Sequence, residues 1–347
     1  MAGNFVRDAS NKARDVDREE INDIIDYQSL NEKQQKVFKR IETHYNDIIT
    51  GKKVEPLRVL VMGTAGTGKS YLIKAIRVQL HKMAGMESKS PILVIAPTGV
   101  AAFNINGSTI HSTFSIPIIK EKIADLNSEK LKQLQERLRD VTYFIIDEKS
   151  MVGRRMLSLI DKRLRQAFPE NKNEPFGGRS IIMFGDFGQL PPVLDLPMYT
   201  TNTSRDIMSN DGIACYKQFR EVYKLDVVQQ QSGNSDTQKS FREILIRLRD
   251  GECTLDDWKR LTSRFEEKLS SIEKEGFKEE VSILTKWIDV DRVNEEMLRS
   301  LKRPVAKIRA EHTGGREAKQ ASSDTAKGLE AQLLLAKGCR VMLTANL

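Results

Sequence analysis

Short apolar runs alternate with amphipathic stretches between residues 57 and 186. Four of these runs, LRVLVMG, PILVIAP, VTYFIID and SIIMFGD, have the length and the β-branched content of buried strands. The stretches between them, such as YLIKAIRVQLHKM, carry apolar residues at helical spacing. Strands that are apolar along their whole length are typical of a parallel sheet with helices on both faces. The pattern therefore predicts an α/β fold built on a parallel sheet.

The segments before and inside this alternation have a different character. Residues 1–28 are highly charged and weakly patterned, so we expect a charged leader there. From Leu30 the sequence LNEKQQKVFKRIETHYNDII carries apolar residues at helical spacing, including Val37 and Ile41, and we expect a helix. Residues 115–140 lie between two core strands and have the pattern of a charged amphipathic helix, which indicates an insertion.

A second unit is expected after residue 200, where the polar sequence YTTNTSRDIMSNDG interrupts the alternation and indicates a loop. We expect a first domain over residues 29–200 and a second over residues 215–347. The elements predicted for the second domain are a strand near 224–228, helices at 238–249 and 255–265, a strand at VSILT, a helix around 290–297 and a strand near the terminal GCRVMLTANL.

The composition fits a folded protein with two domains. The chain has 347 residues, of which 39% are hydrophobic and 30% charged, which excludes a disordered chain. No apolar run is long enough to cross a bilayer, so we expect no transmembrane segment and no membrane partner. The N-terminal sequence lacks the apolar core of a signal peptide, and its acidic residues argue against a transit peptide.

The net charge of +8 leaves two interpretations open. A basic protein suits a polyanionic partner such as a nucleic acid, because neutralised phosphates release counterions. A lysine-rich soluble surface explains the same charge without a partner. The three cysteines, Cys215, Cys253 and Cys339, lack the spacing of a metal site and are typical of reduced thiols in the cytosol or nucleus.

The sequence GTAGTGKS fits the phosphate-binding pattern G-x-x-x-x-G-K-[ST]. Its glycines let backbone N–H groups close around phosphate oxygens, and the following helix offers its N-terminus to the anion. Lys69 is placed to reach the β- and γ-phosphates of ATP, and the Ser70 hydroxyl to bind Mg²⁺. A chance glycine-rich turn is the alternative, which the flanking strand and helix disfavour. The predicted nucleotide-binding residues are Gly63, Thr64, Ala65, Gly66, Thr67, Gly68, Lys69 and Ser70.

Two further predicted strands end in acidic residues. Asp147 follows an apolar strand and is placed to hold the Mg²⁺ shell, and Glu148 beside it to orient or deprotonate the attacking water. The alternative is a solvated acidic pair. Asp186 ends the strand of FGDFGQLPPV, and Gln189 follows with an amide that suits a contact to the γ-phosphate and to water. For Gln189 the pattern alone leaves open a polar loop that the prolines fix.

The segment APTGVAAFNINGSTIHSTF follows a predicted strand at the same edge of the sheet as the phosphate-binding loop. Its small neutral donors suit the sugar-phosphate backbone of a nucleic acid without base readout. For His111 the alternative to a nucleic-acid contact is a packed or capping residue. Phe103 and Phe114 suit stacking on bases and apolar packing equally well.

Taken in order, GTAGTGKSYLI, APTGVAAFNINGSTIHSTF, IIDEKSMVG and GDFGQLPPV resemble the motifs of the Pif-type, RecD-like DNA helicases of superfamily one, most closely the eukaryotic, transposon-associated branch. FREILIRLRDGECTLDDWKRL and GLEAQLLLAKGCRVMLTANL look like that family's second RecA-like domain. The resemblance covers nearly the whole chain from Leu30 onward. It implies a P-loop NTPase with two RecA-like domains and a small wedge, here the insertion at 115–140.

The resemblance also implies a function and a set of site residues. A helicase of this family uses ATP and Mg²⁺ to move 5′-to-3′ on single-stranded DNA and to separate duplexes in DNA repair, recombination and telomere maintenance. Its partners would be single-stranded DNA and duplex junctions, and we expect a monomer in the nucleus, with the cytosol and mitochondrion left open. Gln34, in the Q-motif-like LNEKQQKVF, would contact adenine, and Gln189 would sense the nucleotide. The implied DNA contacts are Pro97, Thr98, Gly99, Thr109, His111 and Ser112.

Two features depart from the family pattern. After the strand that ends near Val228, the family has an arginine that reaches the γ-phosphate, and here Gln229 takes that position in the catalytic set. A glutamine keeps a hydrogen bond but supplies no positive charge. The sequence also stops at VMLTANL, before the family's later DNA-contacting and arginine motifs, so we expect a partial second domain. We therefore expect ATP and Mg²⁺ binding with strongly impaired hydrolysis.

Two alternatives to an active helicase remain. A degenerate or truncated member of the family would bind ATP, and single-stranded DNA, without unwinding, as Gln229 and the missing motifs suggest. An unrelated P-loop ATPase, such as a loader or a signalling switch, is the other. The segments APTGVAA and GDFGQLPPV disfavour this last alternative because they occur together.

Overall fold

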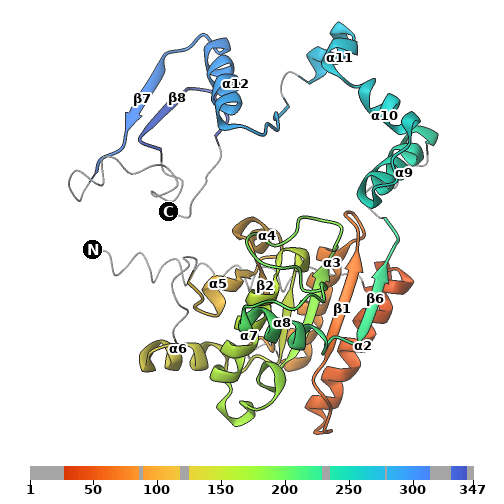
Figure 1. Cartoon of the computed structure of the whole chain (residues 1–347), viewed down its shortest axis with the longest axis vertical. Coiled ribbons are helices and arrows are strands. Elements are labelled where there is room, and N and C mark those ends of the chain that lie inside the picture. Colours follow the sequence, from red (N-terminus) through yellow and green to blue (C-terminus); the bar gives the residue numbers. More distant parts are fainter. Residues whose placement is uncertain are drawn as a thin grey trace. The chain divides into compact units, whose positions relative to one another are not determined.

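The computed structural model describes residues 27–85, 89–117, 125–228, 235–277, 280–312 and 330–341 (Figure 1). The chain divides into two compact units, Met1–Trp258 and Lys259–Leu347. None of the helices in the described ranges is both long and apolar enough to cross a membrane.

A six-stranded sheet forms the centre of the first unit. Its strand order is β3-β2-β4-β5-β1-β6, and each of the five pairings is parallel. This sheet confirms the predicted α/β fold. The strands are β1 (Arg58–Gly63), β2 (Ile92–Ala96), β3 (Ser108–Thr109), β4 (Tyr143–Ile146), β5 (Ser180–Gly185) and β6 (Glu221–Leu225).

Helices cover both faces of this sheet, as its apolar strands require (Figure 1). Alternate residues of β4 pack on opposite sides: Tyr143 and Ile145 contact one core cluster, Phe144 and Ile146 the other. The first cluster receives α2 (Glu32–Ile49), α3 (Lys69–Ala84) and α4 (Gly99–Asn104). The second receives α5 (Ile110–Thr113), α6 (Ser128–Leu138), α7 (Arg154–Ala167) and α8 (Ile207–Tyr216). Short 3-10 turns complete the unit: η1 (Tyr27–Ser29), η2 (Lys149–Met151), η3 (Pro169–Asn171) and η4 (Pro175–Gly178).

The strand predicted near 224–228 lies in the first sheet, which corrects its assignment to the second unit. β6 pairs with β1 along Val59–Gly63, and Leu225 is its only buried residue. An edge strand with polar, partly exposed positions does not show the continuous apolar run of a central strand. The division into domains at 29–200 and 215–347 stays a prediction.

Part of the predicted polar loop after residue 200 is helical. Asp206 caps α8 by accepting a hydrogen bond from the Met208 amide, at 3.1 Å. Gly212 lies against α7, since a Cβ there would be 2.1 Å from the Arg154 carbonyl oxygen. The Asn, Asp and Gly residues that suggested a loop therefore serve as a cap and as a close helix contact.

Two helices follow β6, as predicted for residues 238–249 and 255–265. α9 (Asp236–Asp250) and α10 (Leu255–Thr262) are joined by a two-pronged ion pair between Arg247 and Asp257, with N–O distances of 2.8 and 2.7 Å.

The predicted insertion at 115–140 contains α6, whose Leu134 and Leu138 are fully buried. The insertion is therefore packed into the second core cluster over this helix.

The second unit contains η5 (Glu266–Lys268), α11 (Ser271–Gly276), α12 (Trp287–Ser300), β7 (Val305–Arg309) and β8 (Gln332–Ala336). β7 and β8 form an antiparallel pair. The predicted strand VSILT was wrong, because residues 281–285 are described and form no strand there. Val281 and Ile283 are 79% and 95% exposed, so this apolar run is not buried against a core as the prediction of a sheet strand required.

Candidate functional site

The loop between β1 and α3 has the geometry of a phosphate cradle. Gly66 and Gly68 have φ values of 79° and 74°, in the left-handed region that favours glycine. At Gly63 a Cβ would lie 2.5 Å from the Thr67 hydroxyl, so a larger residue would displace the loop. Gly68 is also the N-cap of α3, which places the N–H groups of the helix start at the loop.

Lys69 closes this loop with its own side chain. Its Nζ donates to the carbonyl oxygens of Gly63 and Thr64, at 2.8 and 3.0 Å. These are the bonds that a phosphate would replace. Ser70, the next residue, is exposed.

Gln34 joins the start of α2 to the same loop. It is buried, and its Nε2 donates to the Thr67 carbonyl oxygen at 3.1 Å. Its Oε1 accepts from the Asn31 amide at 3.0 Å, which completes a capping box. The amide thus supports the phosphate-binding loop directly, and its contact with adenine stays a prediction.

Asp147 and Glu148 lie directly after β4, next to β5 in the sheet. Asp147 is buried, and burial raises its pKa, while the charges of Lys69 and Lys149 oppose that shift. Burial and the neighbouring Asp147 also raise the pKa of Glu148. Glu148 has a φ of 52°, a left-handed conformation that costs a non-glycine residue about 1 kcal/mol. Strained backbone of this kind is frequent at functional sites.

Gln189 belongs to a tight turn after β5. Its amide N–H donates to the Asp186 carbonyl oxygen at 3.0 Å, and the Gly188 amide donates to the Asp186 carboxylate at 3.0 Å. The Gln189 Oε1 is buried, and none of the described residues donates a hydrogen bond to it. An acceptor without such a bond can accept one from a ligand or a water molecule.

Lys149 is a site residue that the sequence analysis missed. It is fully buried, and its Nζ donates to the carbonyl oxygens of Gly185 and Val61, the latter at 3.4 Å. It also lies 4.6 Å above the centre of the Phe187 ring. Burial lowers the pKa of Lys149 to about 8. The side chain of this residue, which directly follows the acidic pair in the sequence, thus links β1 to the end of β5.

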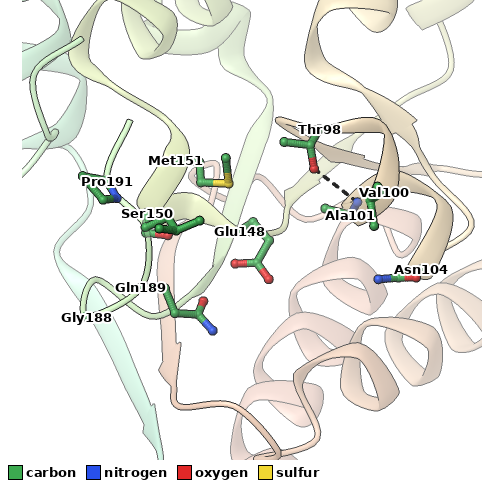
Figure 2. Close-up of a pocket in the computed structure, with 11 residues that line it drawn as sticks. Thr98, Val100, Ala101, Asn104, Glu148, Ser150, Met151, Gly188, Gln189 and Pro191 are labelled. Atoms are coloured by element: carbon green, nitrogen blue, oxygen red, sulfur yellow. Dashed lines mark hydrogen bonds between the residues drawn. The ribbon is translucent and has the colours of Figure 1, made fainter. Parts of the chain in front are cut away.

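The residues predicted to contact DNA lie at or directly after the ends of two neighbouring strands, β2 and β3. The pairing of Ala96 with Thr109 puts Pro97, Thr98 and Gly99 beside the start of α5, at the same sheet edge as the phosphate-binding loop. Thr98 caps α4 by accepting from the Ala101 amide at 3.2 Å (Figure 2).

The second part of this predicted DNA surface is α5. Thr109 caps α5 by accepting from the Ser112 amide at 3.2 Å, and its hydroxyl donates to the Ser112 hydroxyl at 2.9 Å. His111 is half-buried, and burial lowers its pKa. These side chains thus also stabilise the local turns.

An open cleft of about 610 Å³ brings three of the predicted groups together (Figure 2). Thr98, Glu148 and Gln189 all line it. Asn104, Ser150, Met151 and Leu190 line it too, and the sequence analysis had given them no role. Glu148 is therefore accessible from the side on which α4 carries the predicted DNA contacts.

The two phenylalanines left open by the sequence are distinguished by burial. Phe114 is fully buried and stacks at a tilt on Phe144, with ring centroids 5.7 Å apart. Phe103 on α4 is 80% exposed. Phe114 therefore serves packing, and Phe103 is available to a ligand.

The donor set fits a Mg²⁺ ion held mainly by phosphates. Ser70 and Asp147 offer a hydroxyl and a carboxylate, the hard oxygen donors that Mg²⁺ prefers. Within the described ranges no group of three or more His, Cys, Asp or Glu side chains could form a metal cage. Mg²⁺ bound with a nucleotide needs only one or two protein ligands. Gln229, the remaining predicted catalytic residue, lies outside the described residues.

Comparison with known proteins gave consistent matches. The model of the family described as PIF1-like helicase matches residues 29–259. The ATP-dependent DNA helicase PIF1 of Xenopus laevis is 30% identical over 303 residues, which cover 87% of this chain and 43% of that protein.

Solved structures match as well. The Pif1 helicase from Candida albicans superposes with a TM-score of 0.66 and 25% identity, over 88% of this chain and 63% of that one. The Pif1 helicase from Bacteroides, in complex with ADP-AlF3 and single-stranded DNA, gives a TM-score of 0.53 and 25% identity, over 84% and 63%. The chain thus spans less than two thirds of these relatives. The matches confirm the predicted RecA-like P-loop fold.

Proposed function

The chain belongs to the PIF1-like helicase family, and from this premise we propose that it acts as an ATP-dependent DNA helicase. It would couple ATP hydrolysis to 5′-to-3′ movement on single-stranded DNA and to the separation of duplexes. One observation carries the proposal. Lys69, the acidic pair after β4 and Gln189 come from neighbouring strands to one edge of the sheet, where parallel α/β proteins bind their ligands.

The proposed nucleotide site is the loop from Gly63 to Ser70. Its N–H groups bind the phosphates, and Lys69 exchanges its carbonyl partners for the β- and γ-phosphates. Ser70 and Asp147 would hold Mg²⁺, which would supply positive charge to the phosphates. Gln34 links the bound nucleotide to α2 through Thr67.

Glu148 is the proposed general base. Its raised pKa places it closer to neutrality than an ordinary carboxyl, which suits a group that accepts a proton from water. Gln189 holds the γ-phosphate and the attacking water through its amide, and its free Oε1 supports this role. Both line the cleft in Figure 2.

Single-stranded DNA would bind along α4 and α5, through Pro97, Thr98, Gly99, Thr109, His111 and Ser112. The hydroxyl groups of these residues suit phosphate and sugar contacts. Duplex junctions would meet the inserted segment at 115–140. We also propose a monomer that acts in the nucleus, in repair, recombination and telomere maintenance, as the family implies.

Phe103→Ala is expected to weaken binding of an oligothymidine by roughly 5- to 150-fold, because base stacking on an aromatic ring contributes about 1–3 kcal/mol. Fluorescence anisotropy measures the affinity. The thermal unfolding temperature should not change, since Phe103 is exposed. Phe114→Ala is the matched comparison and should instead lower stability by about 3–5 kcal/mol. Unchanged DNA affinity in Phe103→Ala would reject α4 as a stacking surface.

A second candidate function is favoured by Gln229. A chain that lacks the family arginine would bind Mg·ATP and single-stranded DNA but turn ATP over slowly. DNA-stimulated ATP turnover of the purified chain distinguishes the two functions. This second function predicts strongly impaired turnover together with measurable ATP binding. Robust turnover would reject the impairment and leave the active helicase.

A further inference from the structure

Arg249, near the end of α9, forms an ion pair with Asp186 in the turn that contains Gln189. Its Nε and Nη2 donate to the two carboxylate oxygens of Asp186, at 2.9 and 2.6 Å. The Asp186 side chain is only 5% exposed. Burial would raise the pKa of Asp186, but the hydrogen bonds from Arg249 and from the Gly188 amide outweigh it and lower that pKa. The ion pair is therefore sheltered and maintained at neutral pH.

The turn leaves no space beside this arginine. A Cβ on Gly188 would lie 2.5 Å from the Arg249 Nε, so the guanidinium lies directly against the backbone of the turn. The Asp186 oxygen that accepts from the Gly188 amide also accepts from Arg249. One carboxylate thus fixes both the turn and the end of α9.

Arg249 joins α9 to the turn after β5. Among the described residues of that helix only Ile244 is buried. Lys149 lies near Asp186, but its Nζ already bonds to backbone carbonyls. A shift of α9 would therefore pull on Asp186 and on the turn to which Gln189 belongs.

We propose that Arg249 is a positioning residue that couples α9 to the nucleotide sensor, by holding the Asp186–Gln189 turn in the conformation that reads the γ-phosphate. The inference rests on the proposed function, because Gln189 must contact the nucleotide for its position to matter.

Arg249→Gln in the full chain tests the coupling, with Arg247→Gln as a matched control. Arg247 is on the same helix, makes the same two-pronged pair with Asp257, and has nearly the same side-chain exposure, 32% against 33%. The readout is the ratio of affinities for a fluorescent non-hydrolysable ATP analogue and for fluorescent ADP. We expect Arg249→Gln to reduce the preference for the triphosphate about tenfold, as one charge-assisted contact is lost, and Arg247→Gln to leave it unchanged.

Two further variants separate positioning from general destabilisation. Arg249→Lys, which keeps the charge but not the planar fork, should restore part of the preference. In a Gln189→Ala background Arg249→Gln should have no additional effect on the ratio, since the group that it positions is gone. Equal ratios in Arg249→Gln and Arg247→Gln, or an undiminished effect in that background, would overturn the proposal.

Hydrogen exchange supplies a readout that needs no nucleotide. The Gly188 and Gln189 amides should exchange faster in Arg249→Gln than in Arg247→Gln, because both bond to Asp186. Unchanged exchange would overturn the proposal. A chain that binds neither nucleotide would reject the proposed function instead, and the exchange rates would still decide whether Arg249 holds the turn.

Discussion

Replacing Lys69 with alanine is expected to lower the affinity for Mg·ATP by a factor of roughly 100 or more. The Lys69 Nζ is 2.8 and 3.0 Å from two carbonyl oxygens of the phosphate-binding loop, so it lies within the cradle itself. With a nucleotide bound, these contacts become charge-assisted bonds to phosphate. Each such bond contributes about 1.5–3 kcal/mol, and the neutral alanine supplies none.

Isothermal titration calorimetry of the full chain with Mg·ATP measures this loss. Lys82→Ala is the control, because Lys82 is an exposed lysine in the last turn of the same helix, α3. It removes the same charge far from the loop and should leave the affinity unchanged. Equal affinities in Lys69→Ala and the unmodified chain would refute the nucleotide site.

The parallel sheet was predictable because its central strands are buried on both faces. Phe144 and Ile146 pack on one side and Tyr143 and Ile145 on the other, so the whole strand reads as apolar. β6 is an edge strand with one buried residue, so its pattern predicted a strand but not its place in the first sheet. The stretch 281–285 shows the opposite error, an apolar run that forms no strand.

The residues of the candidate site also differ in whether the sequence could predict them. The phosphate-binding loop is encoded by local spacing, because Gly63, Gly68 and Lys69 act through the backbone of one turn. Arg249 and Lys149 could not be predicted from spacing. Arg249 meets Asp186 across 63 positions of sequence, and Lys149 looks like a solvated charge until the fold encloses it. Pairs of this kind depend on tertiary contacts, which a pattern along the chain does not contain.

Gln229→Arg is expected to raise the DNA-stimulated rate of ATP turnover by roughly 100-fold or more. Arginine fingers in related NTPases accelerate phosphoryl transfer by roughly 10³ to 10⁵, because they neutralise charge that develops on the γ-phosphate. The chain leaves the first sheet beside the cradle: the Leu225 carbonyl oxygen would lie 3.3 Å from a Cβ on Gly63. Gln229 follows four positions later in the sequence.

The neighbouring glutamines provide the control for this substitution. Gln231→Arg adds the same charge two positions further along the chain, so it tests whether any added arginine raises turnover through stronger DNA binding. Steady-state turnover at saturating oligothymidine and Mg·ATP separates the catalytic rate from both affinities. A gain confined to Gln229→Arg assigns the missing charge to this position. Equal rates in the two variants would mean that an arginine at 229 does not act on the γ-phosphate, and slow turnover in the unmodified chain would then need another cause.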